Sequence, residues 1–190
     1  MTKASLLEFF YRWRGRLVAM AGILLLVLRW GETEAHWVFW AGAAVLLAGI
    51  IVRVVAQMHL HYRLRDPVKL TVTGPYSYMR NPIYVGNTLI VCSLCFLSEL
   101  VWFVPVALLW CTIVYSFVAR WEESRLVTKF GPDYETYMQN VPRWIPRLRP
   151  WQAPWQPVRK QSFLRYLVPS IVAEMHCLLW PVPFILKEIL

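Results

Sequence analysis

The chain has 190 residues, of which 58% are hydrophobic and only 16% charged, and its mean hydropathy is +0.43. A water-soluble domain of this length is more polar, so the composition excludes an ordinary soluble fold and indicates a membrane protein. The net charge of +9 would suggest a nucleic-acid partner in a soluble protein. Basic residues beside apolar runs are explained more simply by the positive-inside rule and by anionic lipid head groups. We therefore expect the lipid bilayer as a partner and no nucleic acid.

Four apolar runs predict membrane helices, at roughly residues 17–30, 35–58, 83–98 and 100–119. The second run can cross about 30 Å of hydrocarbon at about 1.5 Å per residue, and Arg53 near its end can snorkel to the interface. The first run is short unless the aromatic residues before it extend the helix. Only the neighbourhood of Glu99 separates the third run from the fourth, so these two should form a tight hairpin.

Lys and Arg residues concentrate in three places: before the first run, in residues 59–81 and in residues 120–162. The positive-inside rule then places the N-terminus, residues 59–81 and residues 120–162 on the cytoplasmic side, where the last two segments can meet. No small-residue cleavage site follows the first run, so no signal peptide is expected. The apolar tail at 163–190 is broken by three prolines and is compatible with a fifth span, a re-entrant helix or an interfacial helix. The chain is thus predicted to be one all-α, multi-pass membrane domain of four to five spans.

The segment from Thr73 to Gly86 is polar and rich in turn residues, yet it leads directly into the third apolar run. Asn81 before Pro82 is typical of an N-cap followed by proline at the first helical position, and the positive end of such a helix attracts anions. Arg80 adds a positive charge at this point. An interfacial anchor of tyrosine and arginine is the alternative interpretation. The candidate binding residues are Gly74, Pro75, Tyr76, Tyr78, Arg80, Asn81, Pro82, Tyr84 and Gly86.

A second polar segment follows the fourth apolar run and begins with Arg120, Glu122 and Glu123. Two carboxylates at the foot of a membrane helix are costly without partners, so they are candidates for function, although solvated helix-end charges are the alternative. After Gly131, a short helix should begin at Pro132 and place two tyrosines on one face. With both segments on one side of the membrane, the helix end and Arg80 could bind the carboxylate of a zwitterion and a glutamate its amino group. This segment adds the candidate residues Tyr134 and Tyr137.

Together, the two segments resemble those of the isoprenylcysteine carboxyl methyltransferase and phospholipid methyltransferase superfamily. The resemblance covers roughly residues 70–146 and consists of Gly-Pro-Tyr…Arg-Asn-Pro-x-Tyr-x-Gly followed by Glu-Glu-x-x-Leu…Phe-Gly-x-x-Tyr-x-x-Tyr. It implies cytoplasmic loops that bind S-adenosylmethionine through residues 74–86, Glu123, Tyr134 and Tyr137. We expect a lipophilic methyl acceptor: a prenylcysteine-like carboxylate, a phospholipid amine or another hydrophobic small molecule. As a hypothesis, Arg120, Glu122 or Glu123 would orient or deprotonate it. Position 81 is Asn where prenylcysteine methyltransferases typically have His.

Two other functions remain open from the sequence. Membrane reductases of steroid or isoprenoid double bonds, which use NADPH, carry a related segment, but Asn87 stands here where they have Glu. A membrane scaffold that binds lipid head groups is the non-catalytic alternative. His59 and His61 have a spacing that metal sites sometimes use, yet methyl transfer needs no metal and none is expected. The four cysteines, Cys92 and Cys95 among them, are expected to be apolar packing residues.

Overall fold

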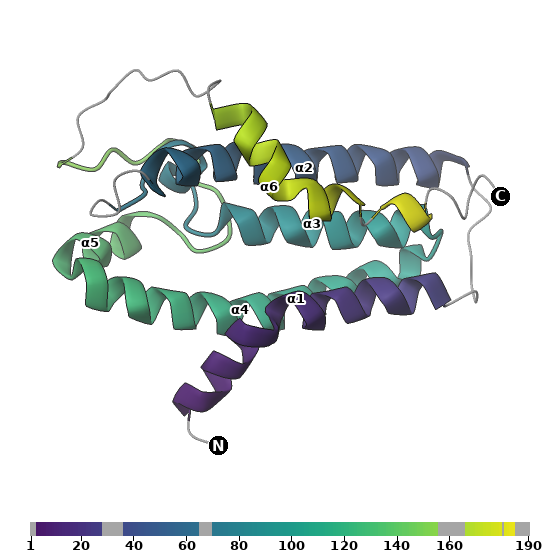
Figure 1. The fold of residues 1–190 in the computed structure, drawn as a ribbon, viewed down its shortest axis with the longest axis horizontal. Helices are drawn as coiled ribbons and strands as arrows, with labels where there is room; N and C mark the ends of the chain where they lie inside the picture. Colours follow the sequence, from purple (N-terminus) through teal and green to yellow (C-terminus); the bar gives the residue numbers. More distant parts are fainter. Residues whose placement is uncertain (1–2, 28–35, 65–69, 156–165, 180, 185–190) are drawn as a thin grey trace.

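The computed structural model describes residues 3–27, 36–64, 70–155, 166–179 and 181–184. Every regular element in these ranges is helical, which confirms the predicted all-α membrane fold (Figure 1). The α-helices are α1 (Lys3–Val27), α2 (His36–Leu64), α3 (Pro82–Leu97), α4 (Val104–Phe130), α5 (Pro132–Asn140) and α6 (Leu167–Leu179). Two short 3-10 helices, η1 (Gly74–Ser77) and η2 (Val101–Phe103), precede α3 and α4.

The four long helices alternate in direction along the chain, with α2 packed on α3 and α1 packed on α4 (Figure 1). This alternation brings the starts of α1 and α3 and the ends of α2 and α4 to one end of the bundle. The short elements η1 and α5 lie at the same end. We call it the loop end, because both polar segments singled out in the sequence lie there.

Glycines allow α2 and α3 to approach closely. A Cβ atom added to Gly49 would lie 3.0 Å from the carbonyl oxygen of Gly86, and one added to Gly86 would lie 2.6 Å from Cγ of Arg53. Small residues at helix contacts serve this purpose in membrane proteins. The contact places Arg53 directly against the first turns of α3.

Two stretches are long and apolar enough to cross a bilayer: Trp37–Leu60 in α2, and Val101–Phe130, which comprises η2 and α4. Helix α3 is apolar but shorter, with 16 residues. Large apolar side chains remain exposed on these helices, including Trp40 (70% exposed) and Leu109 (63%). Such exposed apolar side chains are suited to contact with lipid acyl chains.

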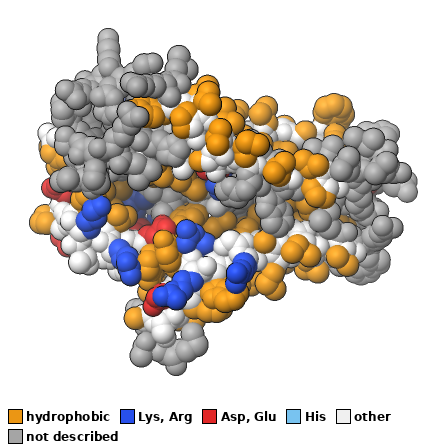
Figure 2. All heavy atoms as spheres, in the orientation of Figure 1, with side chains coloured by type: hydrophobic (Ala, Val, Ile, Leu, Met, Phe, Trp, Pro, Cys, Tyr) orange, Lys and Arg blue, Asp and Glu red, His pale blue; other side chains and the backbone are white. Residues whose placement is uncertain are grey.

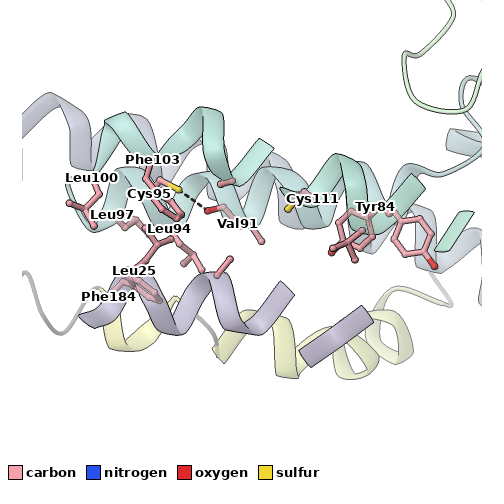
Figure 3. Packing of buried hydrophobic residues seen from close by; sticks show 14 of the residues in the cluster. Leu25, Tyr84, Val91, Leu94, Cys95, Leu97, Leu100, Phe103, Cys111 and Phe184 are labelled. Carbon is pink, nitrogen blue, oxygen red and sulfur yellow. Dashed lines mark hydrogen bonds between the residues drawn. The ribbon is translucent and has the colours of Figure 1, made fainter. Parts of the chain in front are cut away.

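The first helix and the hairpin follow the sequence closely. α1 begins at Lys3, so the residues before the first apolar run extend the helix, which was the condition for that run to be long enough to cross. α3 ends at Leu97, and the chain turns at Glu99, whose φ is +59°, before η2 leads into α4. The tight hairpin is therefore confirmed. Near this turn the core contains Leu25, Leu94, Leu97, Leu100, Phe103 and Phe184 (Figure 3).

The tail forms the short helix α6, which packs against α2. Its 13 residues extend about 20 Å, less than the roughly 30 Å of a hydrocarbon core, so α6 by itself is no fifth span. Ser170 and Glu174 are buried on its inner face, while Val172 and Leu179 are exposed on the other side.

Candidate functional site

The two polar segments meet at the loop end. This agrees with the prediction that both lie on the same side of the membrane. The hydroxyl of Tyr137 on α5 donates to the carbonyl oxygen of Tyr76 in η1 at 2.7 Å. The backbone N–H of Arg80 donates to the carbonyl oxygen of Pro142 at 2.9 Å. The backbone N–H of Trp151 donates to the carbonyl oxygen of Ser77 at 2.9 Å. Residues 70–80 and 132–155 therefore form one packed unit above the ends of the membrane helices.

Gly74 begins η1 with a φ of +60°, a backbone conformation that residues other than glycine rarely adopt. A Cβ atom there would lie 2.0 Å from Nε2 of His59, so the imidazole fills the space beneath the turn. His59 is buried, and its Nδ1 lies 2.8 Å from the carbonyl oxygen of Val55. The position is that of a packing residue. The side chain of His61 is outside the described residues, among which no group of three or more His, Cys, Asp or Glu could hold a metal.

Helix α3 begins at Pro82, with Asn81 in the N-cap position as predicted. The side chain of Asn81 makes no capping hydrogen bond, however; its Nδ2 donates to the carbonyl oxygen of Arg143 at 3.3 Å. Pro82 has no N–H, and the first N–H groups of a helix have no partner within it. The backbone donors of Ile83 and Tyr84 are therefore left for another acceptor.

Glu123 is buried in an ion-pair cluster with two arginines. Arg143 donates through Nε to Oε1 at 3.0 Å and through Nη2 to Oε2 at 2.5 Å. Nη2 of Arg80 lies 3.2 Å from Oε1, while its Nη1 donates to the carbonyl oxygen of Met138 at 2.9 Å. The cluster ties α4 to the start of α3 and to the loop after α5. Sequence reasoning missed Arg143, although it stands in the Val141–Trp144 stretch that closes the second segment.

Two buried polar atoms of the first polar segment lack a hydrogen-bond partner in the described part of the chain. They are Nε of Arg80 and Oγ1 of Thr73, which stands immediately before η1. Buried polar groups are nearly always hydrogen-bonded. Two such atoms without a partner, in the segment that leads into α3, therefore indicate a place where a ligand can bind.

Glu122 faces a different environment from Glu123. Its Oε1 accepts a hydrogen bond of 2.8 Å from the hydroxyl of Tyr84, whose ring stacks on Tyr115 with centroids 4.7 Å apart. Both Tyr84 and Glu122 line a cavity of about 430 Å³ among α1, α2, α3 and α4. That volume is within the usual range for small-molecule sites.

The lining of this cavity changes from polar to apolar with distance from the loop end. The polar or charged lining residues nearest the loop end are Arg14, Arg53, Tyr84, Asn87 and Glu122. Deeper in the bundle it is lined mainly by apolar or small residues: Val18, Ala19, Gly22, Ile90, Val91 and Leu94. A molecule with a polar head and an apolar body would match this gradient.

The other candidate residues lie outside the cavity lining. Arg120 is exposed on α4. Tyr76, Tyr134 and Tyr137 are buried in the loop-end packing, and burial, with the nearby charge of Glu123, raises the pKa of Tyr134 above its usual value. Pro82 is buried at the start of α3, Pro75 and Tyr78 are half-buried, and the backbone N–H of Arg147 donates to the Tyr78 carbonyl oxygen at 3.0 Å.

Arg53 was expected to snorkel to the interface, and the structure corrects this expectation. Its side chain is buried, with Nε donating to Oε2 of Glu174 on α6 at 2.7 Å and Nη2 bonded to the same oxygen. The glutamate comes from the Pro-broken tail, 121 positions away in sequence, so no local pattern connected the two.

Comparison with known proteins places the chain in a family. The phospholipid methyltransferase family model matches residues 37–133, roughly half of the 190 residues. The nickel-cobalt-cadmium resistance protein NccN of Alcaligenes xylosoxydans xylosoxydans is 26% identical over 135 residues, 70% of this chain and 63% of NccN. The cobalt-zinc-cadmium resistance protein CzcN of Cupriavidus metallidurans is 28% identical over 156 residues, 80% of this chain and 70% of CzcN. No solved structure matched the chain.

The matched range contains the whole first segment and the glutamates of the second, and the resemblance inferred from these motifs is confirmed. The chain belongs to the phospholipid methyltransferase family, whose members are membrane methyltransferases.

Proposed function

We propose that the protein transfers a methyl group from S-adenosylmethionine to a lipophilic acceptor, with the donor bound at the loop end and the acceptor in the neighbouring cavity. The observation that carries the proposal is the unpaired, buried Nε of Arg80 beside the free N–H groups at the start of α3. Family membership supports the type of reaction. The geometry of the loop end and of the cavity is what supports the proposed site for each substrate.

The donor carries an amino-acid carboxylate, and this is the group that the loop end is suited to bind. Nε of Arg80 and the backbone N–H groups of Ile83 and Tyr84 are hydrogen-bond donors close together in sequence, and the start of a helix carries a partial positive charge. Glu123 is occupied by its two arginines and serves to hold Arg80 in place. Among the described residues, no arginine forms an ion pair with Glu122. Glu122 is therefore the better carboxylate to bind a positive group of the donor or to orient the acceptor.

Methyl transfer is an in-line displacement at the sulfonium methyl. The bond between sulfur and the methyl carbon breaks with its electron pair going to sulfur, and a lone pair of the acceptor forms the new bond. The product S-adenosylhomocysteine is a neutral thioether, and an acceptor that begins as N–H or O–H loses a proton. The protein contributes by aligning the two substrates and excluding water. Glu122 and Tyr84, at the polar end of the cavity, are suited to orient the acceptor.

We further propose that the loop end faces the cytoplasm. Lys and Arg side chains gather on one half of the face in Figure 2, at the end where α1 begins and α4 ends. Arg125 lies over the ring of Trp121, and Arg14 lies over that of Tyr11, which itself stacks on Trp121. Such a layer of aromatic and basic residues is typical of a cytoplasmic interface. A soluble donor could then enter from water while the acceptor enters from lipid.

The two relatives are named for resistance to divalent metals, which suggests a physiological setting for the reaction. We propose that methylation of a membrane component contributes to growth under metal stress. A deletion strain that grows equally well with and without cobalt or cadmium would exclude this setting but leave the enzymatic proposal intact.

Calorimetry on the full chain in nanodiscs tests the proposal against both alternatives. We expect S-adenosylhomocysteine to bind and NADPH not to bind; binding of NADPH alone would indicate a reductase, and binding of neither a scaffold. The variant Arg80→Lys keeps the charge near Glu123 but removes Nε, so S-adenosylhomocysteine affinity should fall at least about tenfold, the loss of one charge-assisted hydrogen bond. Arg125→Lys is the matched control and should bind as the wild type does.

A further inference from the structure

The ion pair between Arg53 and Glu174 joins the cavity to the C-terminal tail. Arg53 lines the cavity from α2, and Glu174 holds it from α6. Both residues are buried, 7% and 4% exposed. A buried ion pair contributes little net stability compared with an apolar pair of similar size, so its presence against the wall of a cavity suggests a role in binding.

The tail is fixed at two points, which makes Glu174 a rigid partner. α6 packs on α2 at Glu174. Ten positions later, Phe184 is fully buried in the core cluster that contains Leu25 of α1 (Figure 3). The tail therefore connects α2 and α1, which are two of the walls of the cavity. Because Glu174 holds the guanidinium, the orientation of Arg53 depends on this connection.

The hydrogen bonds to Glu174 use only part of the guanidinium. They engage Nε and Nη2, whereas a guanidinium has five N–H donors in a fixed plane. The remaining N–H groups can donate to a molecule in the cavity that Arg53 lines. An arginine oriented in this way favours oxyanions, which accept two parallel hydrogen bonds.

The net charge around the polar end of the cavity also favours an anionic acceptor once the donor is bound. Arg14, Arg53, Glu122 and Glu174 together carry no net charge when all are ionised. S-adenosylmethionine brings a net charge of +1, from its sulfonium, amino and carboxylate groups. The loop-end cluster of Arg80, Arg143 and Glu123 adds a further net charge of +1. The loaded site is therefore positive, so it attracts an anionic acceptor and repels a cationic amine.

We infer that Arg53, held by Glu174 of the tail, binds an oxyanion on the head group of the acceptor and so positions it together with Glu122 and Tyr84. We infer also that the pair of Arg53 and Glu174 selects anionic over cationic acceptors. This rests on the proposed function. A carboxylate and a phosphate both have the required chemistry, and the two are distinguished by the probes below.

The test uses the full chain in phosphatidylcholine nanodiscs and four probes with the same ten-carbon tail: decanoate, decyl phosphate, decanol and decylammonium. We expect the wild type, with S-adenosylmethionine bound, to bind one of the anionic probes at least tenfold more tightly than decylammonium. The tighter of the two anions identifies the head group. Replacing S-adenosylmethionine with the uncharged-sulfur product should reduce this preference severalfold, because one positive charge is lost.

The variants are chosen so that misfolding cannot explain the result. Arg53→Gln leaves Glu174 unpaired and can destabilise the protein, so the double variant Arg53→Gln/Glu174→Gln, which replaces the pair by two neutral amides, is measured as well. The preference for the anionic probe should disappear in the double variant and remain in Arg125→Gln. An undiminished preference in the double variant, or no preference in the wild type, would overturn the inference. Binding of S-adenosylhomocysteine in the same samples reports separately on the proposed function.

Discussion

Glu122 and Glu123 are neighbours in sequence but belong to two different parts of the molecule. Successive residues on a helix point about 100° apart, so one glutamate faces the loop end and the other the cavity. Glu123 is neutralised by Arg80 and Arg143, while Glu122 accepts one hydrogen bond from Tyr84 and lines the cavity. The comparison shows how an adjacent pair of carboxylates can divide structural and chemical roles.

The largest expected loss of stability comes from breaking the ion-pair cluster at the loop end. Replacing Glu123 with Ala leaves two partly or fully buried guanidinium groups without their shared carboxylate, and breaking such a pair costs about 3 kcal/mol. Chemical unfolding in detergent should show this loss. The matched control is Glu135→Ala on the exposed side of α5, which should change stability by less than about 0.5 kcal/mol.

A smaller effect on stability and a larger one on chemistry are expected at the cavity. Glu122→Gln keeps an acceptor for the Tyr84 hydroxyl, so the free energy of unfolding should change by no more than about 1 kcal/mol. Transfer of labelled methyl groups from S-adenosylmethionine into a membrane lipid extract should nevertheless fall at least about tenfold, because the carboxylate is lost from the mouth of the cavity. If Glu122→Gln and Glu123→Gln had the same balance of effects, the division of roles between the two glutamates would be wrong.

Much of the helical framework could be predicted from local patterns. Apolar runs located the long helices, Asn81–Pro82 located the start of α3, and Gly131–Pro132 located the break between α4 and α5. These features depend on residues close together in sequence. The meeting of the two polar segments also followed, because it required only the charge distribution and the number of apolar runs.

The side-chain partners could not be predicted in the same way. Arg143 lies 20 positions from Glu123, and Arg53 lies 121 positions from Glu174, so each contact depends on how helices pack. The basic residues of this chain also have a general explanation in the positive-inside rule, and that explanation concealed these two specific roles. In sequence, Arg53 is indistinguishable from an arginine that snorkels.

The central claim is that S-adenosylmethionine binds where the start of α3 meets the end of α4. Ultraviolet cross-linking of methyl-labelled S-adenosylmethionine to the full chain in nanodiscs, followed by mapping of the labelled peptides, tests it directly. The account predicts label within residues 73–87 or 120–144, removed by excess S-adenosylhomocysteine but not by NADPH. Label confined to other parts of the chain, or unaffected by S-adenosylhomocysteine, would contradict it.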